Sequence, residues 1–515
     1  MGRRRFYHQL VSPTTDESWL QTEYDMTNAM LSDKLYECVP ELRKHLLQVR
    51  DIEKICRQLS VKRLYPSSIY YLHQTIGLTQ TIHNLFKEEN DLQLYFHEKN
   101  DIENYCTELC SFMETCFDIE KCKSSNSLTQ FEEIFIKPGI SVELDNFVTK
   151  YNQNQDLFHE IHKNLNKKMQ ENEKTISDTE FVKIHTTEKS GVSLQITKKR
   201  GLMLKKLCST KSGTILENND KTRWKDISLK HASGTIDEIE IPFLTNICKE
   251  MLIQKEQIQK HAIIAYFHTL NNLEEIYYPL LEAISHYISK VDVLQTKAYI
   301  AKEYHYCCPS IVSDAQKPFV DAKSLRHVLI EHLQTNEVYV ANDICLGKDD
   351  GHTGILLYGT NAVGKTSFIR AIGISIIMAQ AGLFVPCSHF SYKPYHSIFS
   401  RILGNDNLFK GLSTFAVEMS ELRVILKMAD ENSMVLGDEL CSGTETESAL
   451  SIFVSGLMHL GERNCSHIFA THFHEIIRYE EIQNLERLSL KHMSVHYDRE
   501  LYVLVYDRKL QDGPG

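Results

Sequence analysis

The 515-residue sequence has no apolar run long enough to cross a bilayer, because the longest, 372–385, is interrupted by Gln380 and two glycines. No secretory apolar segment opens the chain, and its 14 cysteines are scattered. These absences argue against a secreted disulfide framework and favour an intracellular, reducing compartment, whether cytoplasmic, nuclear, organellar or viral. Basic charge is also scarce overall. With a net charge of −11, any contact with nucleic acid must come from a local patch.

Four cysteines lie close together in the first third of the chain, at Cys106, Cys110, Cys116 and Cys122. Their spacing, C-x3-C-x5-C-x5-C, differs from the standard zinc-binding patterns. We interpret them as thiols in a helical core, with a metal site as the alternative.

Residues 357–367 contain a complete GxxxxGK[ST] phosphate-binding motif. It follows the apolar run 355–358, which predicts a strand, and precedes 368–381, which predicts a helix, as the motif requires. The glycines allow a tight turn whose N–H groups surround phosphate oxygens at a helix N-terminus. Lys365 can neutralise phosphate charge during catalysis, and the Thr366 hydroxyl can bind Mg²⁺. A chance glycine-rich turn is the alternative. The predicted nucleotide-binding residues are Gly359, Thr360, Asn361, Ala362, Val363, Gly364, Lys365, Thr366 and Ser367.

Two later apolar runs also end in polar residues. The run from Ser433 predicts a buried strand that ends in Asp438 and Glu439. Adjacent carboxylates on a strand point in opposite directions, so Asp438 would hold Mg²⁺ while Glu439 orients or deprotonates the attacking water. The alternative is a surface Asp-Glu pair. The run from Ser466 predicts another strand before His472, which could contact the γ-phosphate or the water. A structural histidine is the alternative there.

Helical periodicity dominates the rest of the chain. One stripe, 42–59, recurs at three- and four-residue steps and predicts a single apolar helix face; a second covers 144–169, and helical periodicity also runs from 242 to 289. Between these arms the pattern changes. Alternating apolar residues at 182–184 and 192–196 predict short antiparallel strands.

Basic residues concentrate in this inserted segment. From Lys183 to Lys230 there are twelve Lys or Arg residues against four Asp or Glu residues, a local charge of +8. A position between two helical arms favours contact with DNA phosphates, although a solvated charged face is the alternative. The predicted DNA-binding residues are Lys189, Lys198, Lys199, Arg200, Lys205 and Lys206.

Several motifs together resemble the MutS family of DNA mismatch-repair ATPases. The phosphate loop is similar to the family's GPNxGGKST, and 413–419 is similar to STFxxEM. The segment 438–444 resembles DE(I/L)GRGT, and 470–475 resembles ATHxxE. The segment 339–343 resembles FVPND or FIANP. The match covers nearly the whole chain, specifically in the ATPase region and loosely elsewhere.

The resemblance implies ATP and Mg²⁺ as cofactors and mismatched double-stranded DNA as the partner. It implies that Tyr339 stacks on adenine, with a core tyrosine as the alternative. It also implies that Ser413 and Thr414 reach the γ-phosphate of a partner subunit, which requires a dimer with composite ATPase sites. The helical arms would be the lever and core, and the basic insertion would be the DNA clamp.

The sequence also departs from the family pattern. Thr360 replaces a proline, Cys441 and Ser442 replace Gly-Arg, and Gly191-Val-Ser replaces Gly-Tyr-Tyr. These variants resemble a divergent branch known from large DNA viruses and organelles. The resemblance begins at the core domain and ends at 511–515. We therefore expect this sequence to lack the N-terminal mismatch-reading domain and the C-terminal dimerisation segment.

The predicted fold is multi-domain. An α-helical lever and core, with a small mixed α/β clamp insertion, precedes an α/β P-loop ATPase domain of the ABC superfamily. The predicted domains are 1–140 (first core and lever part), 141–241 (clamp arm and clamp), 242–296 (second core and lever part) and 297–515 (ATPase).

The predicted function is ATP-dependent binding of mismatched DNA in repair, with DNA-dependent ATP hydrolysis controlling a clamp. The alternatives are a nucleotide-switched DNA or junction clamp without mismatch readout, and a chromosome-maintenance ATPase, whose LSGG signature is absent.

Overall fold

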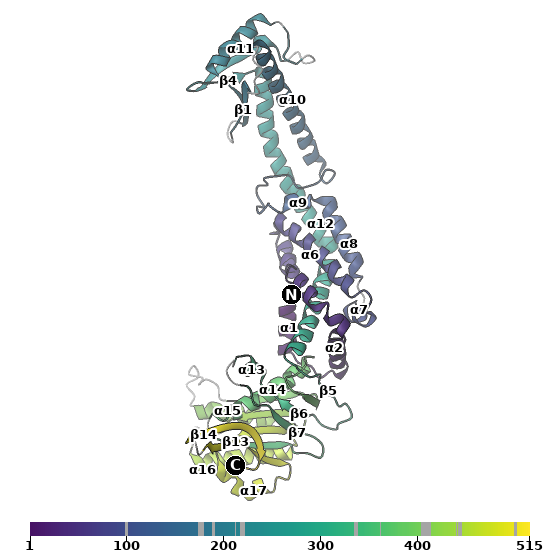
Figure 1. The fold of residues 1–515 in the computed structure, drawn as a ribbon, viewed down its shortest axis with the longest axis vertical. Helices are drawn as coiled ribbons and strands as arrows, with labels where there is room; N and C mark the ends of the chain where they lie inside the picture. The colour runs from purple at the N-terminus through teal and green to yellow at the C-terminus, as the bar shows by residue number, and fades with distance from the viewer. Residues whose placement is uncertain are drawn as a thin grey trace. The chain divides into compact units, whose positions relative to one another are not determined.

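The protein divides into two compact units in a computed structural model (Figure 1). The first unit contains 1–48, 81–100 and 285–515, and the second contains 49–80 and 101–284. The structure describes residues 1–97, 101–173, 180–187, 191–211, 213–216, 222–333, 338–360, 362–402, 414–438, 440, 445–498 and 502–515. The chain is thus multi-domain, α-helical in one part and α/β in another.

Helices form most of the second unit, and one small sheet completes it. Two helices, α6 (Pro66–Leu85) and α12 (Pro242–Glu303), begin in this unit and continue into the first. The other elements are α5 (Ile52–Ser60), α8 (Ile102–Cys116), α9 (Ile119–Cys122), α10 (Val142–Glu173), β1 (Val182–Thr187), β2 (Gly191–Thr197), α11 (Lys198–Thr210), η1 (Trp224–Asp226), β3 (Ser228–Ser233) and β4 (Ile236–Glu240).

The inserted segment folds as a four-stranded sheet, in the order β1-β2-β4-β3, with α11 beside it (Figure 1). β1 and β2 are antiparallel and pair Val182 with Ile196, which confirms the strands predicted from apolar alternation. The alternate residues Leu194 and Ile196 are buried in a core shared with α10, α11 and α12. The Asn154 amide of α10 donates to Gln254 of α12 at 3.2 Å, so these two long helices lie side by side (Figure 1).

The predicted single helix over 42–59 is wrong. Two helices, α4 (Val39–Leu46) and α5, flank a break at 47–51, although apolar residues continue across it at helical spacing. The carboxylate of Asp51 accepts a hydrogen bond from the Lys54 backbone N–H at 3.2 Å. This N-cap satisfies one of the free donors at the start of α5 and favours a new helix over continuation.

The cysteines of the first third lie in or beside helices of the second unit. Cys106 and Cys116 of α8 and Cys122 of α9 are buried, and Cys110 is half-buried. Burial raises the pKa of Cys106 and of Cys122 to about 12, so both thiols stay protonated. The interpretation as helix-core thiols is confirmed.

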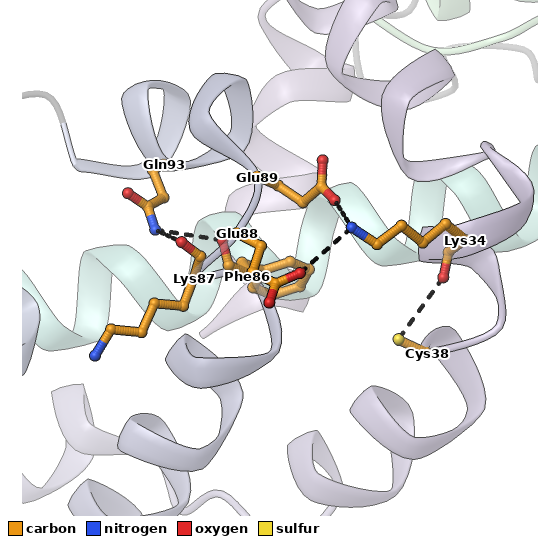
Figure 2. A network of polar contacts seen from close by, with 7 residues as sticks. All are labelled: Lys34, Cys38, Phe86, Lys87, Glu88, Glu89 and Gln93. Atoms are coloured by element: carbon orange, nitrogen blue, oxygen red, sulfur yellow. Dashed lines mark hydrogen bonds and ion pairs between the residues drawn. The ribbon is translucent and has the colours of Figure 1, made fainter.

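The first unit combines short helices with two sheets. The helices before the sheets are α1 (Gly2–Val11), α2 (Glu17–Met30), α3 (Asp33–Tyr36), α4 and α7 (Asn90–His97). Figure 2 shows polar contacts between α3 and the turn from α6 to α7: the Lys34 ammonium lies 2.8 Å from Glu89 and 3.6 Å from Glu88. The hydrogen bond to Glu89 raises the pKa of Lys34. Solvent screens this exposed pair, so it orders the turn more than it stabilises the fold.

The α/β part of this unit contains a four-stranded sheet, in the order β5-β9-β6-β7, and a six-stranded sheet, in the order β10-β11-β12-β8-β13-β14. The elements are β5 (Ser310–Ile311), β6 (Phe319–Leu325), α13 (Val328–Leu333), β7 (Asn342–Leu346), β8 (Gly354–Tyr358), α14 (Lys365–Gln380), β9 (His389–Lys393), β10 (Ser397–Arg401), α15 (Thr414–Met428), β11 (Ser433–Asp438), α16 (Thr446–Glu462), β12 (Ser466–Ala470), η3 (His474–Arg478), α17 (Glu480–Gln483), β13 (Leu488–Asp498) and β14 (Val503–Asp512).

The central strand β8 is covered on both faces. Ile355 and Leu357 pack in a core that includes α14, whereas Leu356 and Tyr358 pack in a core that includes α15 and α16. Burial on both faces explains why β8 is a continuous apolar run rather than an alternating one. The predicted strand at 355–358 and the predicted helix after the phosphate loop are confirmed.

Candidate functional site

Three predicted site segments meet at one edge of the six-stranded sheet. β8, β12 and β11 are parallel neighbours, and their register aligns Leu357 with Ala470 and Ala470 with Asp438. The phosphate loop follows β8, Asp438 ends β11, and His472 follows β12. The carboxyl edge of a parallel sheet is where ligands of such folds bind.

The phosphate loop has the backbone conformation that its glycines permit. Gly359 has φ +150° and Gly364 has φ +104°, and Gly364 is the N-cap of α14. A Cβ added at Gly359 would lie 2.8 Å from Cγ1 of Val363, so a side chain there would clash. Ala362 also adopts a positive φ of 65°, a conformation that non-glycine residues seldom adopt outside constrained sites.

Lys365 is held inside this loop. Its ammonium donates to the carbonyl oxygens of Gly359 at 2.7 Å and Thr360 at 3.1 Å, and the whole residue is 5% exposed. Nε2 of the exposed His472 lies 3.5 Å from the ammonium. The structure thus brings two predicted catalytic residues together from separate strands, around a buried positive charge that suits a phosphate.

The residues predicted to hold Mg²⁺ also meet. The Thr366 hydroxyl donates to Oδ2 of Asp438 at 2.5 Å, and Asp438 is 5% exposed. The other carboxylate oxygen, Oδ1, is buried without a hydrogen-bond partner in the described structure. A buried carboxylate oxygen without a partner is unfavourable, and a cation or its hydration water would supply one. Thr366 and Asp438 therefore fit the divalent cation that the motif implies.

A cavity of about 210 Å³ extends from the phosphate loop to Tyr339. Its lining includes Ser367 of α14 and the loop residues Ala362, Val363 and Gly364. The Tyr339 ring is half-buried, with its centroid 6.4 Å from the His327 ring, and burial raises the pKa of Tyr339 to about 12. The placement of Tyr339 suits a nucleobase next to bound phosphates.

Arg508 lines the same cavity and was not predicted from the sequence. It lies in β14, where the pairing with β13 shifts register between Met493 and Val495, and it has φ +56°. Both amide atoms of Asn342 hold this irregular segment: Nδ2 donates to the Arg508 carbonyl at 2.9 Å, and Oδ1 accepts from the Leu510 N–H at 2.7 Å. Such irregularities redirect side chains near binding sites. No local sequence signal marks Arg508, because its placement depends on strand pairing.

Other predicted residues are only partly placed. Asn361, Glu439, Ser413 and Lys189 lie outside the described residues. Thr414 is the first residue of α15. Their predicted roles remain predictions.

In the second unit, the α11 lysines, Lys198, Lys199, Lys205 and Lys206, are exposed. Arg200 differs from them. Its guanidinium lies 3.9 Å from the centre of the Phe181 ring and donates to the Glu180 carbonyl at 3.2 Å, so it packs against its own fold.

Comparison with known proteins agrees with both the helical and the α/β parts. Residues 1–298 match the family model of MutS domain III, and residues 355–514 match that of MutS domain V. The chain belongs to the MutS family. The resemblance inferred from the motifs is thus confirmed.

MutS relatives come from viruses, mitochondria and bacteria. A MutS homologue of Acanthamoeba polyphaga mimivirus is 30% identical and covers 100% of this chain and 49% of its own length. The mitochondrial DNA mismatch repair MutS homologue of Sarcophyton glaucum is 28% identical, with the same coverage. The DNA mismatch repair protein MutS of Petrotoga mobilis is 25% identical and covers 100% of this chain and 57% of its own length.

The chain therefore spans about half the length of the curated relatives that it matches. No helix in the described part of the chain combines the length and apolar character needed to cross a membrane.

Proposed function

We propose that this chain is an ATP-dependent DNA-binding protein of mismatch repair, in which ATP binding and hydrolysis control a clamp around duplex DNA. The observation that carries the proposal is the contact between Thr366 and Asp438 beside the phosphate loop. It joins a phosphate-binding motif to a carboxylate from another strand, the pair that triphosphate hydrolysis requires. Membership of the MutS family supports the DNA-repair context.

In this proposal each residue of the nucleotide site has one task. The loop N–H groups and Lys365 bind the phosphates, and Thr366 and Asp438 hold Mg²⁺, which when bound neutralises phosphate charge. Glu439 orients or deprotonates the attacking water, and His472 contacts the water or the γ-phosphate.

The base occupies the cavity beyond the loop. Tyr339 stacks on adenine, and the Arg508 guanidinium, from the same cavity lining, contacts the base as a planar cation. This arrangement gives the base two side chains from different strands.

DNA contact takes place in the second unit. The α11 lysines are exposed on one short helix, next to a sheet that the long helices α10 and α12 support. Four lysines that each meet one phosphate would give a log–log salt slope of about −3.6. These contacts bind the backbone and do not read sequence.

We also propose the finer organisation implied by the family. Regions 1–140 and 242–296 form the core and lever, 141–241 forms the clamp arm and clamp, and 297–515 forms a P-loop ATPase domain of the ABC superfamily. Ser413 and Thr414 reach the γ-phosphate of a second copy, so the active form is a dimer with composite sites.

Hydrolysis and binding measurements test this function. Glu439→Gln should retain ATP binding but slow DNA-stimulated hydrolysis by about 10²–10⁴-fold, the usual effect of a positioned base. Parent and Glu439→Gln are compared under saturating ATP and DNA, and equal turnover would remove Glu439 from this role.

A second measurement distinguishes mismatch recognition from general clamping. Affinities for paired and mismatched duplexes are compared at one salt concentration. Tighter binding to the mismatch supports repair, whereas equal affinity identifies a nucleotide-switched clamp without mismatch readout.

A further inference from the structure

Two cysteines from distant parts of the sequence meet in the first unit. The sulfurs of Cys307 and Cys387 are 3.2 Å apart, although the residues are separated by 80 positions. Cys307 follows the end of α12, and Cys387 lies between α14 and β9. A disulfide has an S–S distance of about 2.05 Å, so the two sulfurs need to approach by only about 1 Å.

The backbone holds the two cysteines in place. The N–H of Cys307 donates to the Val385 carbonyl at 2.9 Å, and the Val385 N–H donates back to the Cys307 carbonyl at 3.0 Å. Arg326 ties the same strands together, because its backbone N–H donates to Pro386 at 2.8 Å and its guanidinium donates to the Tyr304 carbonyl at 3.0 Å. Little chain rearrangement is needed to bring the sulfurs together.

The two thiols differ in access and in proton affinity. Cys307 is half-buried, whereas Cys387 is 3% exposed. The hydrogen bond between them lowers the pKa of Cys307 and raises the pKa of Cys387. The more accessible sulfur is therefore the better nucleophile, and the buried thiol is placed to resolve its adduct.

We propose that Cys307 and Cys387 are a redox modification site, at which a small-molecule disulfide such as oxidised glutathione produces an intrachain disulfide. The Cys307 thiolate attacks the oxidant, whose S–S bond breaks, and one glutathione leaves and takes a proton. The Cys387 thiol then loses its proton and attacks the Cys307 sulfur, and the second glutathione leaves with that proton. Two protein thiols are oxidised and one glutathione disulfide is reduced to two glutathiones.

The product would fasten the segment after α12 to the segment after α14. The closed loop contains β8, the phosphate loop and α14, so it restricts a large part of the unfolded chain. In a reducing compartment the thiols would stay free until the oxidant rises, as in a switch rather than a structural cross-link. The phosphate-binding end of α14 lies at the far end of a 16-residue helix, about 24 Å away, so nucleotide affinity should not change.

Oxidation of the full chain with oxidised glutathione, followed by thiol alkylation and non-reducing peptide mapping, tests this site. We expect a peptide pair joining Cys307 to Cys387, and a rise in Tm of about 5–10 °C that dithiothreitol reverses. The Cys387→Ser variant should stop at a glutathione adduct on Cys307. Cys308→Ser, a matched control at the adjacent half-buried thiol, should form the cross-link normally.

Absence of the Cys307–Cys387 peptide in the oxidised parent would overturn the proposal. So would a cross-link between Cys307 and Cys308 in its place. The parent protein alone gives this answer, so the test does not depend on the folding of any variant.

Discussion

Replacement of Asp438 by asparagine should remove the metal-dependent part of nucleotide binding and leave the rest. The side chains are nearly the same size, and the amide oxygen can still accept the hydrogen bond of Thr366. The variant loses the negative charge at Oδ1, which is buried without a partner in the described structure. A carboxylate about 4 Å from a unit charge interacts by about 4 kcal/mol at an effective dielectric constant of 20, and solvent competition reduces this value. We expect Mg²⁺-dependent affinity to fall by about 30–150-fold, or about 2–3 kcal/mol.

Thermal unfolding with ATP, in Mg²⁺ and in EDTA, measures this loss. At a ligand concentration 100 times Kd, binding stabilises the folded parent by about 2.7 kcal/mol, and a 100-fold weaker site retains only about 0.4 kcal/mol. Asp438→Asn should therefore show the same small nucleotide-induced shift in Mg²⁺ and in EDTA. Thr366→Ser, which keeps the hydroxyl, is the matched control and should retain the Mg²⁺ effect. The reasoning is refuted if Mg²⁺ strengthens nucleotide binding equally in Asp438→Asn and in the parent.

Four further results are expected. Lys365→Ala should weaken nucleotide binding itself, as measured by calorimetry, because it removes the charge beside the phosphates. Tyr339→Ala should raise the ATP dissociation constant while Tyr339→Phe stays near the parent, since stacking needs only the ring; lower Tm with unchanged affinity would identify a core tyrosine. Charge reversal of the α11 lysines should weaken matched and mismatched duplex binding alike and flatten the salt slope by about one unit per contact, with Arg200→Gln as the control that changes Tm more than the slope. Burial lowers the pKa of His467 from 6.5 to about 4, so the unfolded chain takes up the proton first as the pH falls; denaturant titrations should show stability falling by about 1.4 kcal/mol per pH unit across that range, and His467→Gln should remove this part of the slope.

The local parts of the site could be predicted from the sequence. The phosphate loop, its strand and its helix follow one another directly, so a motif of eleven residues, 357–367, carries them all. The strand before Asp438 is buried on both faces and reads as a continuous apolar run. The β1–β2 hairpin was also predictable, because alternation of apolar residues reports the buried face of a strand.

Features that depend on distant pairing were missed. Arg508 reaches the cavity through an irregularity in β14 that Asn342 of β7 holds, and neither residue marks the other in the sequence. The pairing of Cys307 with Cys387 depends in the same way on two separated segments. The helix break at 47–51 is a different case. Asp51 before Ile52 is a local N-cap signal, but the apolar spacing that continued across it was given more weight.

Duplex affinity measured against nucleotide state tests the central claim most directly, because the claim joins the nucleotide site of one unit to the basic helix of the other. The dissociation constant of the full chain for a mismatched duplex is measured at one salt concentration without nucleotide, with ADP and with a non-hydrolysable ATP analogue. We predict that the analogue changes this affinity at least about tenfold, which corresponds to about 1.4 kcal/mol of coupling, and that Lys365→Ala abolishes the change. Identical affinity in all three nucleotide states of the parent would contradict the account.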